Sequence, residues 1–338
     1  MADAPQSITD LWASAAWRES MLAWVDDQLA AVGFRRTGEP EQVRLRPWGT
    51  VFRIPTSGGT VWFKAPAPAT VFEVGLYSLL ARKAPHLVLT PLAVDLDRGW
   101  FLLPDGGSTL NDIASGPELI DILVSILPRY GQLQRDLALD VDAMLGLGLT
   151  DMRAAAMPTR FDEAFAAVET WVTGYGDATN RELPLRIAAR RETLVSWCDR
   201  LGTAPAAASI DHHDLHAKNV FVTDGGFTIA DWGDAVIAHP FASLLVTLGF
   251  VRFHLRVGTD DPAVLRVRDT YLDAFTDLAP RRDLIAAADL ACQVAKVTRA
   301  LIFIRSLEAA NDPKHPFARE PLVWLAGILN DSPLDTGP

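Results

Sequence analysis

The chain has 338 residues and a formal net charge of −11 at pH 7, from 31 Lys and Arg against 42 Asp and Glu. This acidic balance argues against a nucleic-acid partner, because phosphate backbones are bound by clustered Lys and Arg. Hydrophobic residues make up 49% of the sequence, which excludes wholesale disorder and is enough to build two compact lobes.

The cysteines and the apolar runs indicate a cytoplasmic protein. Cys198 and Cys292 lie in separate segments without metal-ligand spacing, so we expect free buried thiols. The N-terminal residues lack the basic and apolar regions of a signal peptide. The longest apolar run, residues 241–251, is too short to cross a membrane. We therefore expect no membrane as partner.

The N-terminal third changes from a helical to a β-rich pattern. Residues 8–32 carry apolar side chains at helical spacing and end at Gly33, a common helix stop. Residues 42–103 contain short β-rich runs separated by glycine turns, and a helical pattern at 72–80 interrupts them. This region predicts a small antiparallel sheet with one inserted helix. The β-rich runs are VRLR, TVFRIP, TVWFK, LAVDL and WFLL.

After Leu110 the pattern is helical almost to the end of the chain, and a hairpin at residues 219–231 is the exception. We therefore expect four parts along the chain. These are an N-terminal helical segment over residues 1–35, a β-rich N-lobe over 36–104, a helical C-lobe over 105–330 and a loose tail over 331–338.

Residues 212–231, HHDLHAKNVFVTDGGFTIAD, contain the most informative group of polar side chains. Two short strands flank the turn Asp224-Gly225-Gly226, because Asp and Gly favour tight hairpins. Folding the strands back brings Asn219 beside Asp231, and Asp214 lies just upstream. A magnesium-dependent phosphoryl transferase needs this inventory of one carboxylate to accept a hydroxyl proton and two oxygen ligands for the metal.

A β-rich lobe, a connector and a helical lobe with H-x-D-x-x-x-x-N and then D-W resemble the protein-kinase-like fold. This is an α+β fold of two lobes, with a small antiparallel sheet in the N-lobe and a larger, mainly helical C-lobe. The match is closest to the aminoglycoside phosphotransferase and choline kinase families, whose loop typically reads H-x-D-L-H-x-x-N. Here that loop is HHDLHAKN, residues 212–219, and the second motif is IADW, residues 229–232.

The resemblance implies a role for each matching residue. Asp214 corresponds to the catalytic base, and Asn219 and Asp231 correspond to the Mg²⁺ ligands. His212 is expected to brace the loop. His216 is expected either to approach the transferred phosphoryl group or to make local hydrogen bonds. The implied reaction moves the γ-phosphoryl group of ATP or GTP to a hydroxyl of an aminoglycoside, amino sugar, sugar or amino alcohol.

The β-rich lobe supplies the expected nucleotide contacts. Lys64 ends the strand run TVWFK, and a strand-borne lysine pairs with the α- and β-phosphates in this fold. Glu73, nine residues later, is either the ion-pair partner of Lys64 or simply a favourable acid in the first turn of a helix.

The sequence departs from the protein-kinase pattern at two places: the loop that covers the phosphates and the segment that binds the adenine. The segment RPWGTV has only Gly49 where protein kinases have three glycines. Pro104 has no N–H, so either the backbone donor to the adenine comes from a neighbour such as Leu103 or Asp105, or the adenine sits differently.

Beyond the IADW motif, Ser243 occupies the region where many family members have an Asp, and we expect it to hydrogen-bond the catalytic loop. Asp234 either touches substrate or caps the following turn. The sequence indicates neither the acceptor nor the oligomeric state. Unranked candidates for the acceptor pocket are Trp171, Tyr175, Trp197, His254, Lys296 and Arg299.

Three other classes of protein share parts of this pattern. The cluster of His and Asp over residues 211–216 could belong to a metal-dependent hydrolase, although no second ligand group is evident in the sequence. The chain could also be a nucleotide-binding module without catalysis, but the base, both metal ligands and the lysine are all present. A protein kinase is disfavoured, since neither a glycine-rich loop nor an activation segment is present.

Overall fold

The computed structural model describes residues 7–175, 182–223, 226–308, 310 and 315–336, without the side chains of 171–175. The chain divides into two compact units. The first unit comprises residues 1–108, 221–233 and 305–315, and the second comprises 109–220, 234–304 and 316–338. The domain boundaries expected from the sequence stay a prediction.

The first unit is built on a five-stranded antiparallel sheet with strand order β1-β2-β3-β5-β4. All five strand runs and the inserted helix are where the sequence predicts them. The elements are α1 (Ile8–Ala13), α2 (Ala15–Ala31), β1 (Glu41–Arg46), β2 (Gly49–Thr56), β3 (Gly59–Pro66), η1 (Pro68–Thr70), α3 (Phe72–Lys83), β4 (Ala93–Asp95) and β5 (Trp100–Pro104).

The helical pattern over residues 8–32 forms two helices, because Ser14 divides it. The backbone of Ser14 is extended, and its hydroxyl accepts a hydrogen bond from the Trp17 N–H at 3.3 Å. The same hydroxyl donates to the Leu11 carbonyl at 2.7 Å. Ser14 therefore ends α1 and caps α2, a role for which serine is favoured.

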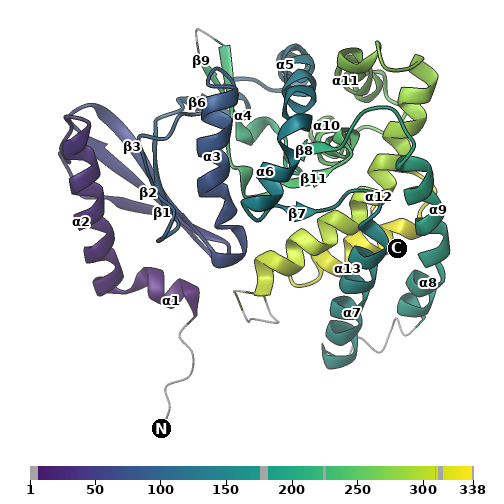
Figure 1. Cartoon of the computed structure of the whole chain (residues 1–338), viewed down its shortest axis with the longest axis horizontal. Helices are drawn as coiled ribbons and strands as arrows, with labels where there is room; N and C mark the ends of the chain where they lie inside the picture. Colours follow the sequence, from purple (N-terminus) through teal and green to yellow (C-terminus); the bar gives the residue numbers. More distant parts are fainter. Residues whose placement is uncertain (1–6, 176–181, 224–225, 309, 311–314, 337–338) are drawn as a thin grey trace. The chain divides into compact units, whose positions relative to one another are not determined.

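Alternation along the strands gives the sheet two faces. Phe52 and Phe63 lie in an apolar core with residues of α2. Lys64, the next residue of β3, points to the opposite face, and α2 and α3 lie on opposite sides of the sheet (Figure 1). On the α3 side, Tyr77 packs against Phe101 with ring centroids 5.2 Å apart. Strand alternation thus places Lys64 on the face that α3 covers.

The expected hairpin is present but shorter than predicted. Its strands are β9 (Val220–Thr223) and β10 (Gly226–Ile229), in a sheet of order β10-β9-β6 with β6 (Ser108–Thr109). Asn219 precedes β9 in the short helix η4 (Ala217–Asn219), and Asp231 follows the end of β10. The turn residues Asp224 and Gly225 lie outside the described residues.

The second unit is mainly helical, as expected, but a three-stranded sheet was missed. Strand β11 (Val236–Ala238) pairs in parallel with β7 (Thr150–Asp151) and antiparallel with β8 (Ser209–Asp211). Strands of two or three residues are too short to show alternation in the sequence. The longer helices are α5 (Gly116–Leu137), α7 (Met157–Tyr175), α9 (Arg191–Leu201), α10 (Leu244–Leu255), α11 (Pro262–Leu272) and α12 (Arg281–Glu308).

Short helices complete the architecture. They are α4 (Leu110–Ile113), η2 (Ala138–Asp140), α6 (Val141–Gly146), α8 (Leu183–Ala189), η5 (Trp232–Asp234), η6 (Pro240–Ser243), η7 (Asp273–Phe275), α13 (Glu320–Ala326) and η8 (Gly327–Leu329). Of the helices that the structure describes, none combines the length and hydropathy that a membrane span requires.

Candidate active site

In the first unit, Lys64 joins two carboxylates. Its Nζ lies 2.7 Å from Glu73 Oε1 and 2.6 Å from Asp231 Oδ1. Strand β3 positions Lys64, the first turn of α3 positions Glu73, and the segment after β10 positions Asp231. The side chain of Glu73 is 1% exposed, so its carboxylate is held inside the unit beside the lysine.

The two neighbouring carboxylates determine the charge state of Lys64. Burial alone would lower the pKa of Lys64, but the Asp231 and Glu73 carboxylates outweigh burial, and the pKa is raised. Lys64 is therefore an ammonium ion at neutral pH. Such a cation can bind phosphate oxygens while Glu73 holds its position.

Asp231 has an unusual backbone conformation. Its φ of 62° lies in the left-handed region, which is uncommon outside glycine, although Asp tolerates it better than most residues. The Asp231 N–H donates to the Tyr77 hydroxyl at 3.0 Å. Its two carboxylate oxygens accept from Lys64 and, at 3.1 Å, from Arg44. The surroundings of this carboxylate are thus already cationic.

In the second unit, the loop from Asp214 to Asn219 folds on itself. The Asn219 amide nitrogen donates to the Asp214 carbonyl at 2.9 Å and to Asp214 Oδ2 at 3.2 Å. The side-chain oxygen of Asn219 does not take part in these two hydrogen bonds, so it can coordinate a cation. Asn219 and Asp231 belong to different units, so their expected proximity stays a prediction.

Arg299 of α12 is the functional neighbour that the sequence did not rank. Its Nη2 donates to Asp214 Oδ1 at 3.0 Å, and its Nη1 donates to Asp234 Oδ2 at 3.0 Å. Nη1 also donates to the His213 carbonyl at 2.9 Å. The side chain is 13% exposed, and its guanidinium lies over the Phe303 ring. Arg299 and Asp214 are 85 residues apart in the sequence, so no local spacing pattern predicts their contact.

This arrangement keeps Asp214 ionised. Burial would raise the pKa of Asp214, but Arg299 and His216 outweigh burial and hold that pKa well below its usual range. Asp234 is an ion-pair partner of Arg299, and its expected contact with substrate or its role as a cap stays a prediction. One guanidinium therefore orients two carboxylates.

Beneath the loop lies a buried polar network. Asp211 accepts from the His213 N–H at 2.8 Å and from the Ser243 hydroxyl at 2.6 Å. Tyr130 OH lies 2.8 Å from Ser243 Oγ and accepts from the His212 N–H at 3.0 Å. Burial, and then Asp211, raise the pKa of Tyr130, so it stays protonated. Ser243 therefore supports the loop through Asp211 and Tyr130.

The two candidate histidines are placed differently. His212 is fully buried, and its Nδ1 accepts from the Asp214 N–H at 3.3 Å, which suits a bracing role. His216 Nε2 lies 3.4 Å from Asp214 Oδ2, and its ring stacks on Phe250. His216 also caps η4 by accepting from the Lys218 N–H. The local hydrogen bonds expected for His216 are thus present.

The remaining candidates for nucleotide binding have structural roles of their own. Gly49 pairs with Arg46 across a two-residue turn and opens β2. Leu103 pairs with Trp62 in the sheet. Asp105 Oδ1 accepts from the Trp62 indole N–H at 3.2 Å. Contact of these residues with a nucleotide stays a proposal.

A cavity of about 580 Å³ opens beside Asp214 in the second unit. Of the acceptor-pocket candidates expected from the sequence, Arg299 is the one that lines this cavity. Lys296 is instead buried, donates to the carbonyls of Gly327 and Ser332, and has its pKa lowered by burial to about 8. Trp197 and His254 lie outside the lining, and the side chains of Trp171 and Tyr175 are outside the described residues.

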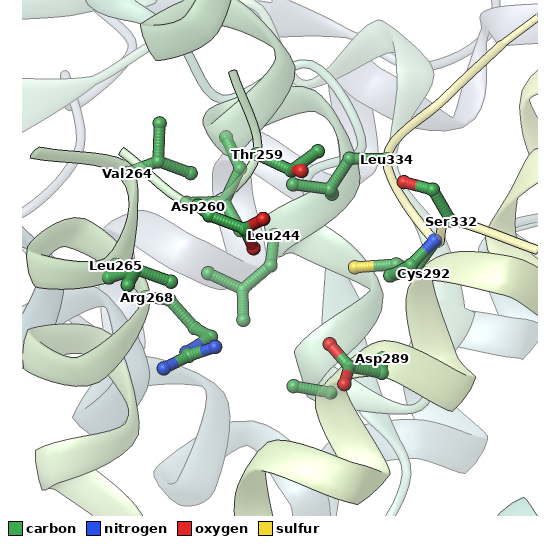
Figure 2. A pocket seen from close by; sticks show the side chains of 13 residues that line it. Leu244, Thr259, Asp260, Val264, Leu265, Arg268, Asp289, Cys292, Ser332 and Leu334 are labelled. Carbon is green, nitrogen blue, oxygen red and sulfur yellow. The ribbon is translucent and has the colours of Figure 1, made fainter. Parts of the chain in front are cut away.

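A second cavity, of about 260 Å³, is lined by residues of α10, α11 and α12. Figure 2 shows Arg268 and Asp289 on opposite sides of this cavity and Cys292 next to Ser332. None of the predicted catalytic or metal-binding residues lines this cavity. The cavity beside Asp214 is therefore the one of the two that a predicted catalytic residue lines.

The candidate metal ligands are of two kinds: the His and Asp cluster considered for a hydrolase, and the oxygen atoms considered for Mg²⁺. Over the described residues, no group of three or more His, Cys, Asp and Glu side chains is arranged to hold a metal. Asp211 and His213 bind each other, so the cluster proposed for a hydrolase is used structurally. The oxygen atoms of Asn219 and Asp231 are the hard ligands that Mg²⁺ prefers.

Comparison with known proteins identifies the class. The model of the phosphotransferase enzyme family (APH) matches residues 34–284, so the chain belongs to this family. The expectation of a small-molecule kinase is confirmed at this level, and the family favours it over a hydrolase. A search of curated protein sequences gave no significant match.

Solved structures agree with this assignment. A choline kinase from Cryptosporidium parvum Iowa II has a TM-score of 0.62 at 12% identity, covering 92% of this chain and 94% of that chain. A macrolide 2'-phosphotransferase from Brachybacterium faecium has a TM-score of 0.53 at 19% identity, covering 91% and 98%. At these identities the likeness concerns the fold, and the expected α+β, protein-kinase-like fold is confirmed.

Proposed function

We propose that this phosphotransferase moves the γ-phosphoryl group of ATP or GTP to a hydroxyl of a small molecule, with Asp214 as the base. The observation that carries the proposal is Asp214 itself. It is ionised, fixed by Arg299 and Asn219, and borders an open cavity large enough for an acceptor. Family membership supports the same reaction.

Asp214 acts mainly by orientation. Because its pKa lies well below the usual range, it is a weak base that aligns the acceptor hydroxyl and takes the proton late. Late proton transfer suits phosphoryl transfer, whose transition state is loose and needs little activation of the nucleophile.

The nucleotide contacts come from the first unit. The Lys64 ammonium, held by Glu73, supports the α- and β-phosphates. Mg²⁺, held by oxygens of Asn219 and Asp231, would neutralise charge on the phosphates. The backbone near Leu103 and Asp105 would contact the purine base of the nucleotide. The turn before Gly49 would cover the phosphates.

The proposal extends to acceptor and location. Structural neighbours are named as choline and macrolide kinases, and aminoglycosides, amino sugars, sugars and amino alcohols belong to the same range of acceptors. We place the protein in the cytoplasm, because Cys198 and Cys292 are free and buried.

The test is a coupled screen of ADP and GDP release over these acceptor classes, with the product identified by mass spectrometry. We expect release that requires both an acceptor and Mg²⁺, and a product that carries one added phosphoryl group. Nucleotide binding without transfer to any acceptor would instead support a non-catalytic binding module.

A further inference from the structure

The wall of the cavity beside Asp214 is largely apolar. Helix α10 contributes Leu245, Val246, Phe250 and Phe253, and Leu334 lies on the C-terminal segment. Phe253 is 85% exposed, an unusual state for a phenylalanine that lines a cavity. An apolar ligand in the cavity would cover it and remove its surface from water.

The charged side chains of this cavity do not suit a polycation. Among its described lining residues, Asp214 is the one carboxylate, and it is already ion-paired with Arg299. The other charged side chain of fixed sign is a second guanidinium, Arg252, which binds Asp335 at 2.8 Å. An acceptor with several ammonium groups would therefore meet two like charges and no further carboxylate in the lining.

The aromatic side chains are not arranged as a cage for a quaternary ammonium either. The Phe250 ring is stacked with both His216 and His254, at centroid distances of 5.7 Å and 5.5 Å. The Trp324 ring already faces the Arg299 guanidinium at 5.9 Å. Recognition of a quaternary cation uses several open aromatic faces. Among the described rings that line this cavity, only Phe253 has no ring or guanidinium partner of this kind.

From this lining we infer that the cavity takes an uncharged, mainly apolar alcohol or phenol as the acceptor. The inference rests on the proposed function and names its substrate class. The apolar body of the acceptor packs on α10, and its hydroxyl reaches Asp214. The two guanidiniums donate hydrogen bonds to neutral oxygen atoms of the same molecule.

The first experiment measures binding to the full chain by calorimetry, with ADP and Mg²⁺ present. The probes are octyl β-glucoside below its micellar concentration, glucosamine, choline and kanamycin. We expect the Kd of octyl β-glucoside to be at least about tenfold below that of each cationic probe, as a difference of several methylenes produces. Tighter binding of a cationic probe, or no saturable binding of octyl β-glucoside, overturns the inference.

The second experiment locates the binding. Phe253→Asp replaces an exposed ring by a carboxylate, so the fold should tolerate it, and we expect about a tenfold weaker affinity for octyl β-glucoside. The matched control is Leu139→Asp, which adds the same charge at a 94% exposed position outside the cavity lining. Equal affinities in the two variants would show that the cavity is not the site.

The two proposals fail in different ways. If octyl β-glucoside binds as expected but no probe is phosphorylated, the proposed function fails and the binding preference stands. If kanamycin or choline is phosphorylated more efficiently than octyl β-glucoside, phosphoryl transfer stands and the inferred acceptor class is wrong.

Discussion

Arg299 decides the chemical state of Asp214. It is a mostly buried cation that bridges Asp214 and Asp234, and without it Asp214 would keep the desolvation cost of burial. Since the folded pKa of Asp214 lies below its unfolded value, the ion pair stabilises the fold above the usual pKa of Asp. That contribution is lost as pH falls through the lower, folded pKa.

Replacing Arg299 should therefore move the acidic limb of activity. In Arg299→Gln, burial acts on Asp214 without the guanidinium, so its pKa rises and the acidic limb of kcat/KM shifts to higher pH. Arg299→Lys keeps the charge and should restore much of the original profile. The measurement is kcat/KM against pH.

The control for this prediction is Arg191→Gln, which removes an exposed pair with Asp162. It should leave the acidic limb where it is in the wild type. An Arg299→Gln profile that coincides with the control would contradict the role assigned to Arg299.

Ser243 is a second residue whose effect can be isolated. Ser243→Ala removes the hydroxyl that donates to the buried Asp211 carboxylate at 2.6 Å. We expect the free energy of unfolding to fall by about 1.5–3 kcal/mol, the usual range for a hydrogen bond to a charged group. Urea unfolding measures it. Ser125→Ala, at an exposed position of α5, should change stability far less, and equal effects would argue against the network.

At the scale of elements, Lys64, Glu73 and Asp231 meet because three local patterns agree. Alternation in β3 turns Lys64 toward α3, the first turn of α3 presents Glu73, and the end of β10 presents Asp231. Each element is short and strongly patterned, and each was evident in the sequence. The contacts among Lys64, Glu73 and Asp231 therefore depend on β3, α3 and β10 together.

Lys64→Met tests the nucleotide half of the proposal. The variant loses a charged partner for the phosphates, and we expect ATP·Mg²⁺ affinity to fall by about 1.5–3 kcal/mol, or roughly tenfold to 150-fold. Calorimetry measures it. Lys83→Met removes the same charge from the end of α3 and should bind nucleotide as the wild type does. An unchanged affinity in Lys64→Met would refute the assignment.

The elements also show where reading the sequence succeeds. Strands β1 to β5 and helix α3 carry long enough patterns to be predicted. Strands β7, β8 and β11 do not, because they have two or three residues and, unlike β4, do not lie within a longer β-rich run. Ser14 interrupts a helix that apolar spacing alone makes continuous. Arg299 was missed as a partner of Asp214, because a tertiary contact between a loop and a distant helix follows no spacing rule in the sequence.

At the scale of the whole molecule, the proposed catalytic groups are divided between the two units. Lys64, Glu73 and Asp231 belong to the first, whereas Asp214 and Asn219 belong to the second. The chain passes from one unit to the other after Val220 and returns after Gly233. The segment around the hairpin therefore contributes residues to both units.

The most direct test compares wild type and Asp214→Asn in acceptor-dependent ADP release, with the phosphorylated product measured by mass spectrometry. The substitution preserves the shape of Asp214 but removes the proton acceptor. We predict that turnover falls by about 10²–10⁴-fold, while calorimetry shows wild-type affinity for ATP·Mg²⁺. An Asp214→Asn variant that forms the phosphorylated product at a rate close to that of the wild type would contradict the account.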